Sequence, residues 1–115
     1  LIPTIKRYFS DGMLSELFVY KNNLLNGYHI QWFKTGIIKK ICYYLNSKKD
    51  NFYFEYYRTS NPKKIIKYSN GVLDGDYRVF YNKSQLSIKK LKRYLDGNLV
   101  KEIIYNENGI KQYIF

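Results

Sequence analysis

The side chains that most often carry enzyme chemistry are few in this sequence, and they do not recur together. His29 and Cys42 are the one histidine and the one cysteine of 115 residues, so they cannot form a zinc cluster by themselves. No pair of carboxylates recurs at a spacing suited to general acid–base catalysis. Gly71 and Gly75 are not followed by a Gly-Lys-Ser/Thr run, which excludes a phosphate-binding loop. We therefore predict no enzyme, no small-molecule substrate, and no catalytic, cofactor-binding or metal-binding residue. His29 is expected to be an ordinary sheet position and Cys42 a small core hydrophobe.

Lysine is the residue type whose spacing does suggest a binding chemistry. Lysine pairs occupy equivalent places in three successive segments, and two further cations continue the pattern. The candidate anion-binding ladder consists of Lys39, Lys40, Lys63, Lys64, Lys67, Lys89, Lys90 and Arg93. Because adjacent strand residues point to opposite faces, we expect one lysine row on each side of a sheet. Lys67 and Arg93 should extend the row that holds Lys63 and Lys89.

Two interpretations of these lysine rows stay open. Spaced cations beside aromatic rings suit a phosphate backbone or an acidic membrane surface. The alternative is a solvated face that keeps an aromatic sheet soluble and discourages edge-to-edge aggregation. Lysine outnumbers arginine sixteen to four, which argues against specific reading of bases, since arginine dominates such contacts.

Aromatic residues form the second candidate surface, because the chain contains 14 Tyr and 7 Phe but no Ala. Strand alternation places His29, Tyr53 and Tyr77 on one face and a second aromatic set on the other. The candidate aromatic contact face consists of Trp32, Phe54, Tyr56 and Phe80. Rows of rings are expected to form the core of such a sheet, and the alternative is a surface that docks a partner.

A repeat of 24 residues positions these side chains. Aromatic residues close short apolar runs at that interval: Phe9, Phe33, Tyr57, Tyr81 and Tyr105. Three residues beyond each comes a small or turn-forming residue: Gly12, Gly36, Ser60, Ser84 and Asn108. A tyrosine follows eight residues later at Tyr20, Tyr44 and Tyr68, but Tyr94 is displaced by two, which indicates an insertion between Ser84 and Tyr94. The array occupies residues 1–115, with units at approximately 4–27, 28–51, 52–75, 76–101 and a partial 102–115.

Each unit is predicted to contain two strands and two turns. The first strands are 28–33, 52–57 and 76–81, and the second strands are 37–45, 61–69 and 86–95. A tight turn such as 34–36 and a longer turn such as 70–75 join them. Pro62 falls at the start of a strand, where a missing N–H is tolerated. Residues 87–95 have the spacing of one helical turn, but the period favours a strand with a bulge. The predicted fold is all-β, a single elongated, twisted antiparallel meander of consecutive hairpins with about ten strands.

The repeats resemble the MORN repeat, and more closely its shorter variant in antitoxin-like and giant-virus proteins. The best match runs from Tyr56-Tyr57 to Tyr68-Ser69-Asn70-Gly71-Val72-Leu73-Asp74-Gly75. Trp32–Gly36 and Tyr94–Leu99 match in part, and Tyr20–Gly27 has Asn in place of the first glycine. In Tyr44–Asn51, Ser47 and Asn51 replace both glycines. The resemblance implies a row of β-hairpins in one long sheet that serves as a scaffold, and it leaves the task of that scaffold open.

Composition sets the remaining expectations. The net charge of +11 favours anionic partners. One cysteine fits a reducing compartment, and no signal peptide or apolar run long enough to span a membrane is visible. We expect an intracellular (cytoplasmic) protein or a virion component, and the Lys, Asn and Ile bias suggests a giant virus or a bacterium with an AT-rich genome. The chain begins with Leu1 rather than Met, so we expect a fragment of a longer protein.

The main functional prediction is a non-enzymatic repeat scaffold for protein–protein interaction, acting as a structural or assembly component. Its expected partner is another protein or a second copy. One alternative is a basic module that binds anionic lipid or nucleic acid through the lysines. The other, which follows from the resemblance alone, is an antitoxin-like protein that neutralises a toxin.

Overall fold

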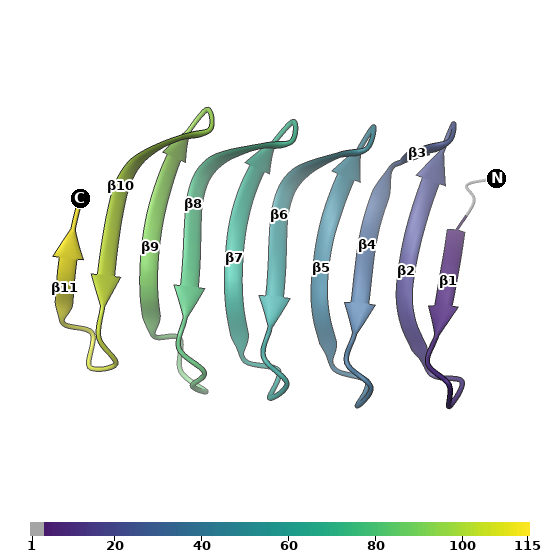
Figure 1. The fold of residues 1–115 in the computed structure, drawn as a ribbon, viewed down its shortest axis with the longest axis horizontal. Helices are drawn as coiled ribbons and strands as arrows, with labels where there is room; N and C mark the ends of the chain where they lie inside the picture. The colour runs from purple at the N-terminus through teal and green to yellow at the C-terminus, as the bar shows by residue number, and fades with distance from the viewer. Residues whose placement is uncertain (1–3) are drawn as a thin grey trace.

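The computed structural model describes residues 4–115, and these residues form one open, elongated antiparallel sheet (Figure 1). Ten strands follow one another across the sheet in the order β1-β2-β4-β5-β6-β7-β8-β9-β10-β11, and the short β3 pairs with β2 alone. No helix occurs among the described residues. The predicted all-β meander is therefore confirmed. The strands are β1 (Thr4–Tyr8), β2 (Leu14–Lys21), β3 (Leu24–Leu25), β4 (Gly27–Trp32), β5 (Ile38–Leu45), β6 (Lys48–Tyr56), β7 (Pro62–Ser69), β8 (Val72–Phe80), β9 (Ile88–Leu95), β10 (Asn98–Tyr105) and β11 (Lys111–Ile114).

At the end of the sheet that is uppermost in Figure 1, two-residue turns replace the longer turns that we predicted. In Asn70-Gly71 both residues have positive φ, 51° and 84°, which is the mark of a type I′ turn. The equivalent pairs in the other repeats, Asn22-Asn23, Asn46-Ser47 and Asp96-Gly97, also have positive φ. Residues 72–75 belong to β8, so the predicted strand at 76–81 begins too late. The error arose because a glycine at position 75 suggests a turn, whereas Gly75 lies inside a strand, with φ of 117°.

The turns at the opposite end follow the 24-residue aromatics. The amide of Phe33 donates to the carbonyl of Ile37 at 2.8 Å, and the amide of Gly36 donates back to Phe33 at 2.9 Å. In the fourth unit the corresponding bond runs from Tyr81 to Ser87 and spans six residues instead of four, so this turn is the longer one. Ser84 and Asn108 do not take up the positive φ seen at Gly12, Gly36 and Ser60; in the last unit Gly109 does so.

Side chains spaced at the repeat interval tie the three later type I′ turns to the preceding repeat. Asp50 Oδ1 accepts a hydrogen bond from the amide of Asn70 at 3.0 Å, and Asp74 Oδ1 accepts one from Asp96 at 3.1 Å. Asn26 Oδ1 does the same for Asn46 at 2.9 Å. A backbone bond accompanies each contact, for example from the amide of Gly71 to the carbonyl of Lys49. Neighbouring hairpins are thus joined at their tips as well as along their strands.

The strand register assigns each side chain to one of the two faces of the sheet, because directly opposed residues of antiparallel strands point to the same side. Cys42, Tyr53 and Ile66 lie opposite one another in β5, β6 and β7, and they are 3%, 7% and 4% exposed. Tyr44, Tyr68, Leu73 and Tyr77 pack around them. We call this side the lysine face, for the lysines described below. The other side carries the row Leu17, Ile30, Ile41, Phe54 and Ile65, and we call it the apolar face.

The molecule is a single layer. Its principal extents are 48 × 34 × 16 Å, and no second sheet or helix covers either face within residues 4–115. In the same residues, no helix is long and apolar enough to cross a membrane.

Candidate interaction faces of the sheet

Three β-bulges place both lysines of each pair on the lysine face. Gln31 opposes Lys40, but the next residue, Trp32, opposes Ile38, so Lys39 is an extra residue in the strand. Lys63 and Lys89 occupy the same place in the next two repeats. The prediction of one lysine row on each face was therefore wrong. It assumed uninterrupted alternation, and a bulge turns an extra side chain toward the face of its neighbour.

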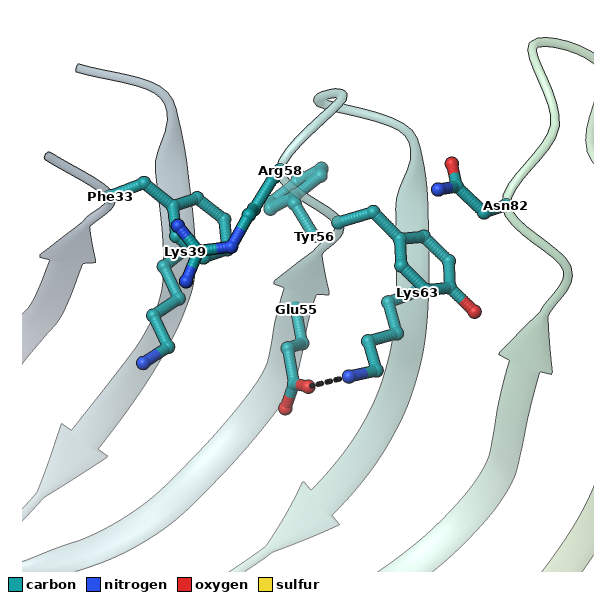
Figure 2. Close-up of a pocket in the computed structure, with 8 residues that line it drawn as sticks. Phe33, Lys39, Glu55, Tyr56, Arg58, Lys63 and Asn82 are labelled. Atoms are coloured by element: carbon teal, nitrogen blue, oxygen red, sulfur yellow. Dashed lines mark ion pairs between the residues drawn. The ribbon is translucent and has the colours of Figure 1, made fainter. Parts of the chain in front are cut away.

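Contacts with aromatic rings confirm this placement. Lys39 Nζ lies 5.9 Å from the centre of the Phe33 ring, Lys63 Nζ lies 5.5 Å from that of Tyr57, and Lys89 Nζ lies 5.7 Å from that of Tyr81. Figure 2 shows Lys39 beside Phe33, and Lys63 paired with Glu55, in the shallow pocket that these residues line. Three of the five 24-residue aromatics, Phe33, Tyr57 and Tyr81, thus form a row of rings with an ammonium group against each.

The rings of this row are not free to accept other flat groups. Arg58 lies 4.9 Å from the centre of the Phe33 ring, and Lys83 lies 5.8 Å from that of Tyr81. The hydroxyl of Tyr57 donates to the carbonyl of Phe80, and that of Tyr81 donates to the carbonyl of Tyr105, both at 2.7 Å. These bonds hold each tyrosine against the following repeat.

Glu55 is the carboxylate at the centre of the lysine face. It accepts a hydrogen bond from the Tyr53 hydroxyl at 2.7 Å, and Lys63 Nζ lies 3.5 Å away. Burial alone would raise the pKa of Glu55, but this hydrogen bond and the charges of Lys64 and Lys63 outweigh it and lower the pKa below its ordinary value. Burial and the contact with Glu55 raise the pKa of Tyr53, so this phenol stays protonated.

The N-terminal end of the lysine face has a second polar cluster, which holds His29. Glu16 Oε2 contacts His29 Nε2 at 2.9 Å and accepts a hydrogen bond from Gln31 at 2.7 Å. The imidazole stacks on Phe18 with ring centres 4.1 Å apart. Burial opposes ionisation of Glu16, but the hydrogen bonds of Gln31 and His29 and the charge of Arg7 lower its pKa. His29 is a packed sheet position, as predicted.

Lys67 and Arg93 do not extend the lysine rows. Lys67 opposes Phe52 on the apolar face, and its Nζ lies 5.7 Å from the centre of that ring. Arg93 opposes Asp76 and donates to its carboxylate at 2.9 Å, while Arg78 donates to the same carboxylate at 2.7 Å. The Arg93 hydrogen bond is the main cause of the lowered pKa of Asp76. These charged residues occupy the C-terminal half of the apolar face.

The N-terminal half of the apolar face carries aromatic and aliphatic side chains. Trp32, Phe54 and Tyr56 lie there as predicted and are half-buried. Phe80 shares the face but is 3% exposed, so it is a core residue rather than a contact residue. Tyr28 and Phe52 were not predicted as contacts, although they are 55% and 44% exposed. Their positions could have been predicted, because Tyr28 and Phe52 lie two residues before Ile30 and Phe54 in the same strands and so point to the same face.

Cys42 and the carboxylates form no metal-binding arrangement in the described part of the chain, where no group of three or more His, Cys, Asp or Glu side chains could hold an ion. Burial raises the pKa of the Cys42 thiol.

Comparison of the chain with protein-family models, curated proteins and solved structures finds no match. The resemblance of the repeats to MORN-type units therefore stays a prediction.

Proposed function

We propose that this chain is a non-enzymatic repeat scaffold that mediates protein–protein contact, with the apolar face as its contact surface and a second copy of the chain as the occupant. The observation that carries the proposal is a single-layer sheet whose apolar face has no cover within residues 4–115. Domains ordinarily bury such a face against a second layer. The MORN-like repeats agree with an assembly role inside a cell or a virion.

The accessible surface area of the chain is large enough for a second copy to cover part of it. The chain exposes 7581 Å², about 900 Å² more than the roughly 6,700 Å² typical of a compact protein of 13.9 kDa. One partner of a standard protein interface buries about 800 Å². The excess is of the same size as the area that one protein contributes to a standard interface.

The distribution of charge favours a second copy as that partner. A two-fold axis through the N-terminal half would place the row of Ile30, Ile41 and Phe54 against the same row of the other copy. The cluster of Asp76, Arg78 and Arg93 would then lie at the rim, where water reaches charged groups.

Sedimentation velocity over a series of protein concentrations tests the proposal. We expect a dimer for the natural sequence and a monomer for the double variant Tyr28→Glu/Phe52→Glu, which places a carboxylate on the contact surface at two exposed positions. Val79→Glu is the control on the opposite face, because it adds one carboxylate to the lysine face between Lys64 and Lys90. A natural chain that stays monomeric at high micromolar concentration, or a double variant that still dimerises, would contradict the proposal.

A further inference from the structure

The lysine face carries more positive charge than its own carboxylates neutralise. Its three pairs are Lys39–Lys40, Lys63–Lys64 and Lys89–Lys90. Among the described residues, Lys63 is the one member of these pairs that makes an ion pair, with Glu55. Lys49 and Lys92 add two cations to this face, and Glu102 opposite Lys92 is a second carboxylate beside Glu55. The ammonium groups still outnumber the carboxylates around the pairs, and this arrangement favours binding of a group with several negative charges.

The spacing of the pairs restricts the shape of that group. The pairs lie on β5, β7 and β9, which are separated by one strand each. Neighbouring strands are about 4.8 Å apart, so consecutive pairs are about 9.6 Å apart. The strand register sets Lys40, Lys64 and Lys90 in one row across the sheet, with Glu55 and Val79 between them.

An α-helix matches this interval. Seven residues of an α-helix advance about 10.5 Å and return a side chain to nearly the same face. The difference of about 1 Å per step is within the reach of a flexible lysine side chain. An extended strand does not match, because residues about 10 Å apart along it point to opposite faces.

Nucleic acid fits the face less well. Single-stranded binding surfaces stack bases on free aromatic rings, whereas Phe33, Tyr57 and Tyr81 are already covered by Lys39, Lys63 and Lys89. The phosphates of a duplex follow one another about every 3.4 Å along each strand, so every third phosphate comes near the interval of the pairs, and the oligonucleotide in the test below distinguishes this alternative.

We propose that the lysine face binds an acidic α-helix of a partner protein, laid across β5, β7 and β9 with Asp or Glu at heptad spacing. Each step of the helix would present carboxylates to one lysine pair, and Glu55 would limit the charge at the middle step. The surface is opposite to the apolar face, so this proposal stands independently of the function proposed above.

Fluorescence anisotropy with two synthetic helical peptides tests the proposal. Both peptides are three heptads long and have the same composition, but one has its Glu residues at heptad spacing and the other has them spread around the helix. We expect the heptad peptide to bind about tenfold more tightly at low salt, since several exposed ion pairs add up. Added salt should weaken this binding.

Charge-reversal variants locate the surface. Lys40→Glu/Lys64→Glu/Lys90→Glu should abolish binding of the heptad peptide, and the same three positions changed to Gln should weaken it if the reversed variant does not fold. Lys6→Glu/Lys48→Glu/Lys67→Glu is the matched control with the same change of charge, because these lysines lie on the apolar face. Equal affinity for the two peptides, tighter binding of a DNA or RNA oligonucleotide than of the heptad peptide, or loss of binding in the control would overturn the proposal.

Discussion

At the scale of single residues, the small core on the lysine face carries much of the packing. Ile66 is 4% exposed and lies between Tyr53 of β6 and Tyr77 of β8. We expect Ile66→Ala to lower the free energy of unfolding by about 2–5 kcal/mol, because it removes buried methyl groups and leaves a cavity. Urea denaturation monitored by circular dichroism measures the change. Ile110→Ala is the control, since Ile110 is 58% exposed and its truncation should change little. Equal effects of the two substitutions would contradict the burial described here.

Glu55 makes the stability of the sheet depend on pH. In the unfolded chain a Glu ionises near its ordinary pKa of about 4.3, whereas in the folded sheet its pKa is lower. The contribution of ionised Glu55 to the free energy of unfolding is complete above the pKa of the unfolded chain, and it is lost as the pH falls through the lower pKa of the folded sheet. We expect unfolding free energy to fall between about pH 5 and pH 3, and to fall less for Glu55→Gln. Parallel pH profiles for the two proteins would show that Glu55 makes no such contribution.

At the scale of elements, the type I′ turns interlock neighbouring hairpins. Gly97 has φ of 86°, and a Cβ added there would lie 2.9 Å from Cγ1 of Val72 in the preceding hairpin. We expect Gly97→Ala to destabilise the protein by about 1 kcal/mol or more, through positive φ and this contact. Gly12→Ala is the matched control, because Gly12 has φ of 90° but no atom within 4 Å of the added Cβ.

A double-mutant cycle separates the two causes of that loss. Val72→Ala removes the Cγ1 atom, so the effect of Gly97→Ala should be smaller in that background and should approach the effect of Gly12→Ala. Thermal unfolding of the four proteins of the cycle supplies the coupling energy. Strictly additive effects would contradict the close approach of Gly97 to Val72.

The elements also show which parts of this fold a sequence can predict. The 24-residue spacing of Phe33, Tyr57 and Tyr81 predicts hairpins and their order, because each repeat must bury its rings against its neighbours. It does not predict the bulge at Lys39, since a bulge inserts a residue without any change of composition. The same bulge, repeated in three units, assigned one lysine of each pair to the wrong face. Gly75 led to a different error, because a turn was predicted there, whereas its positive φ occurs inside a strand.

At the scale of the whole molecule, the two faces differ in chemistry. The lysine face holds the Cys42–Tyr53–Ile66 core beneath paired ammonium groups, and the apolar face presents rings and aliphatic side chains. The apolar face also carries Lys6 and Lys48, and the cluster of Asp76, Arg78 and Arg93 lies toward its C-terminal end. A single layer cannot bury both faces by itself. The proposed function and the proposed helix site follow from this asymmetry, because each face suits a different kind of partner.

Trp32 offers the most direct measurement of the central claim, which is that the apolar face is covered by a second copy. It is the one tryptophan of the chain, and it lies half-buried on that face. We predict that quenching of its fluorescence by acrylamide decreases as protein concentration rises, and that Tyr28→Glu/Phe52→Glu removes this dependence. Quenching that stays constant over the concentration range would contradict the claim.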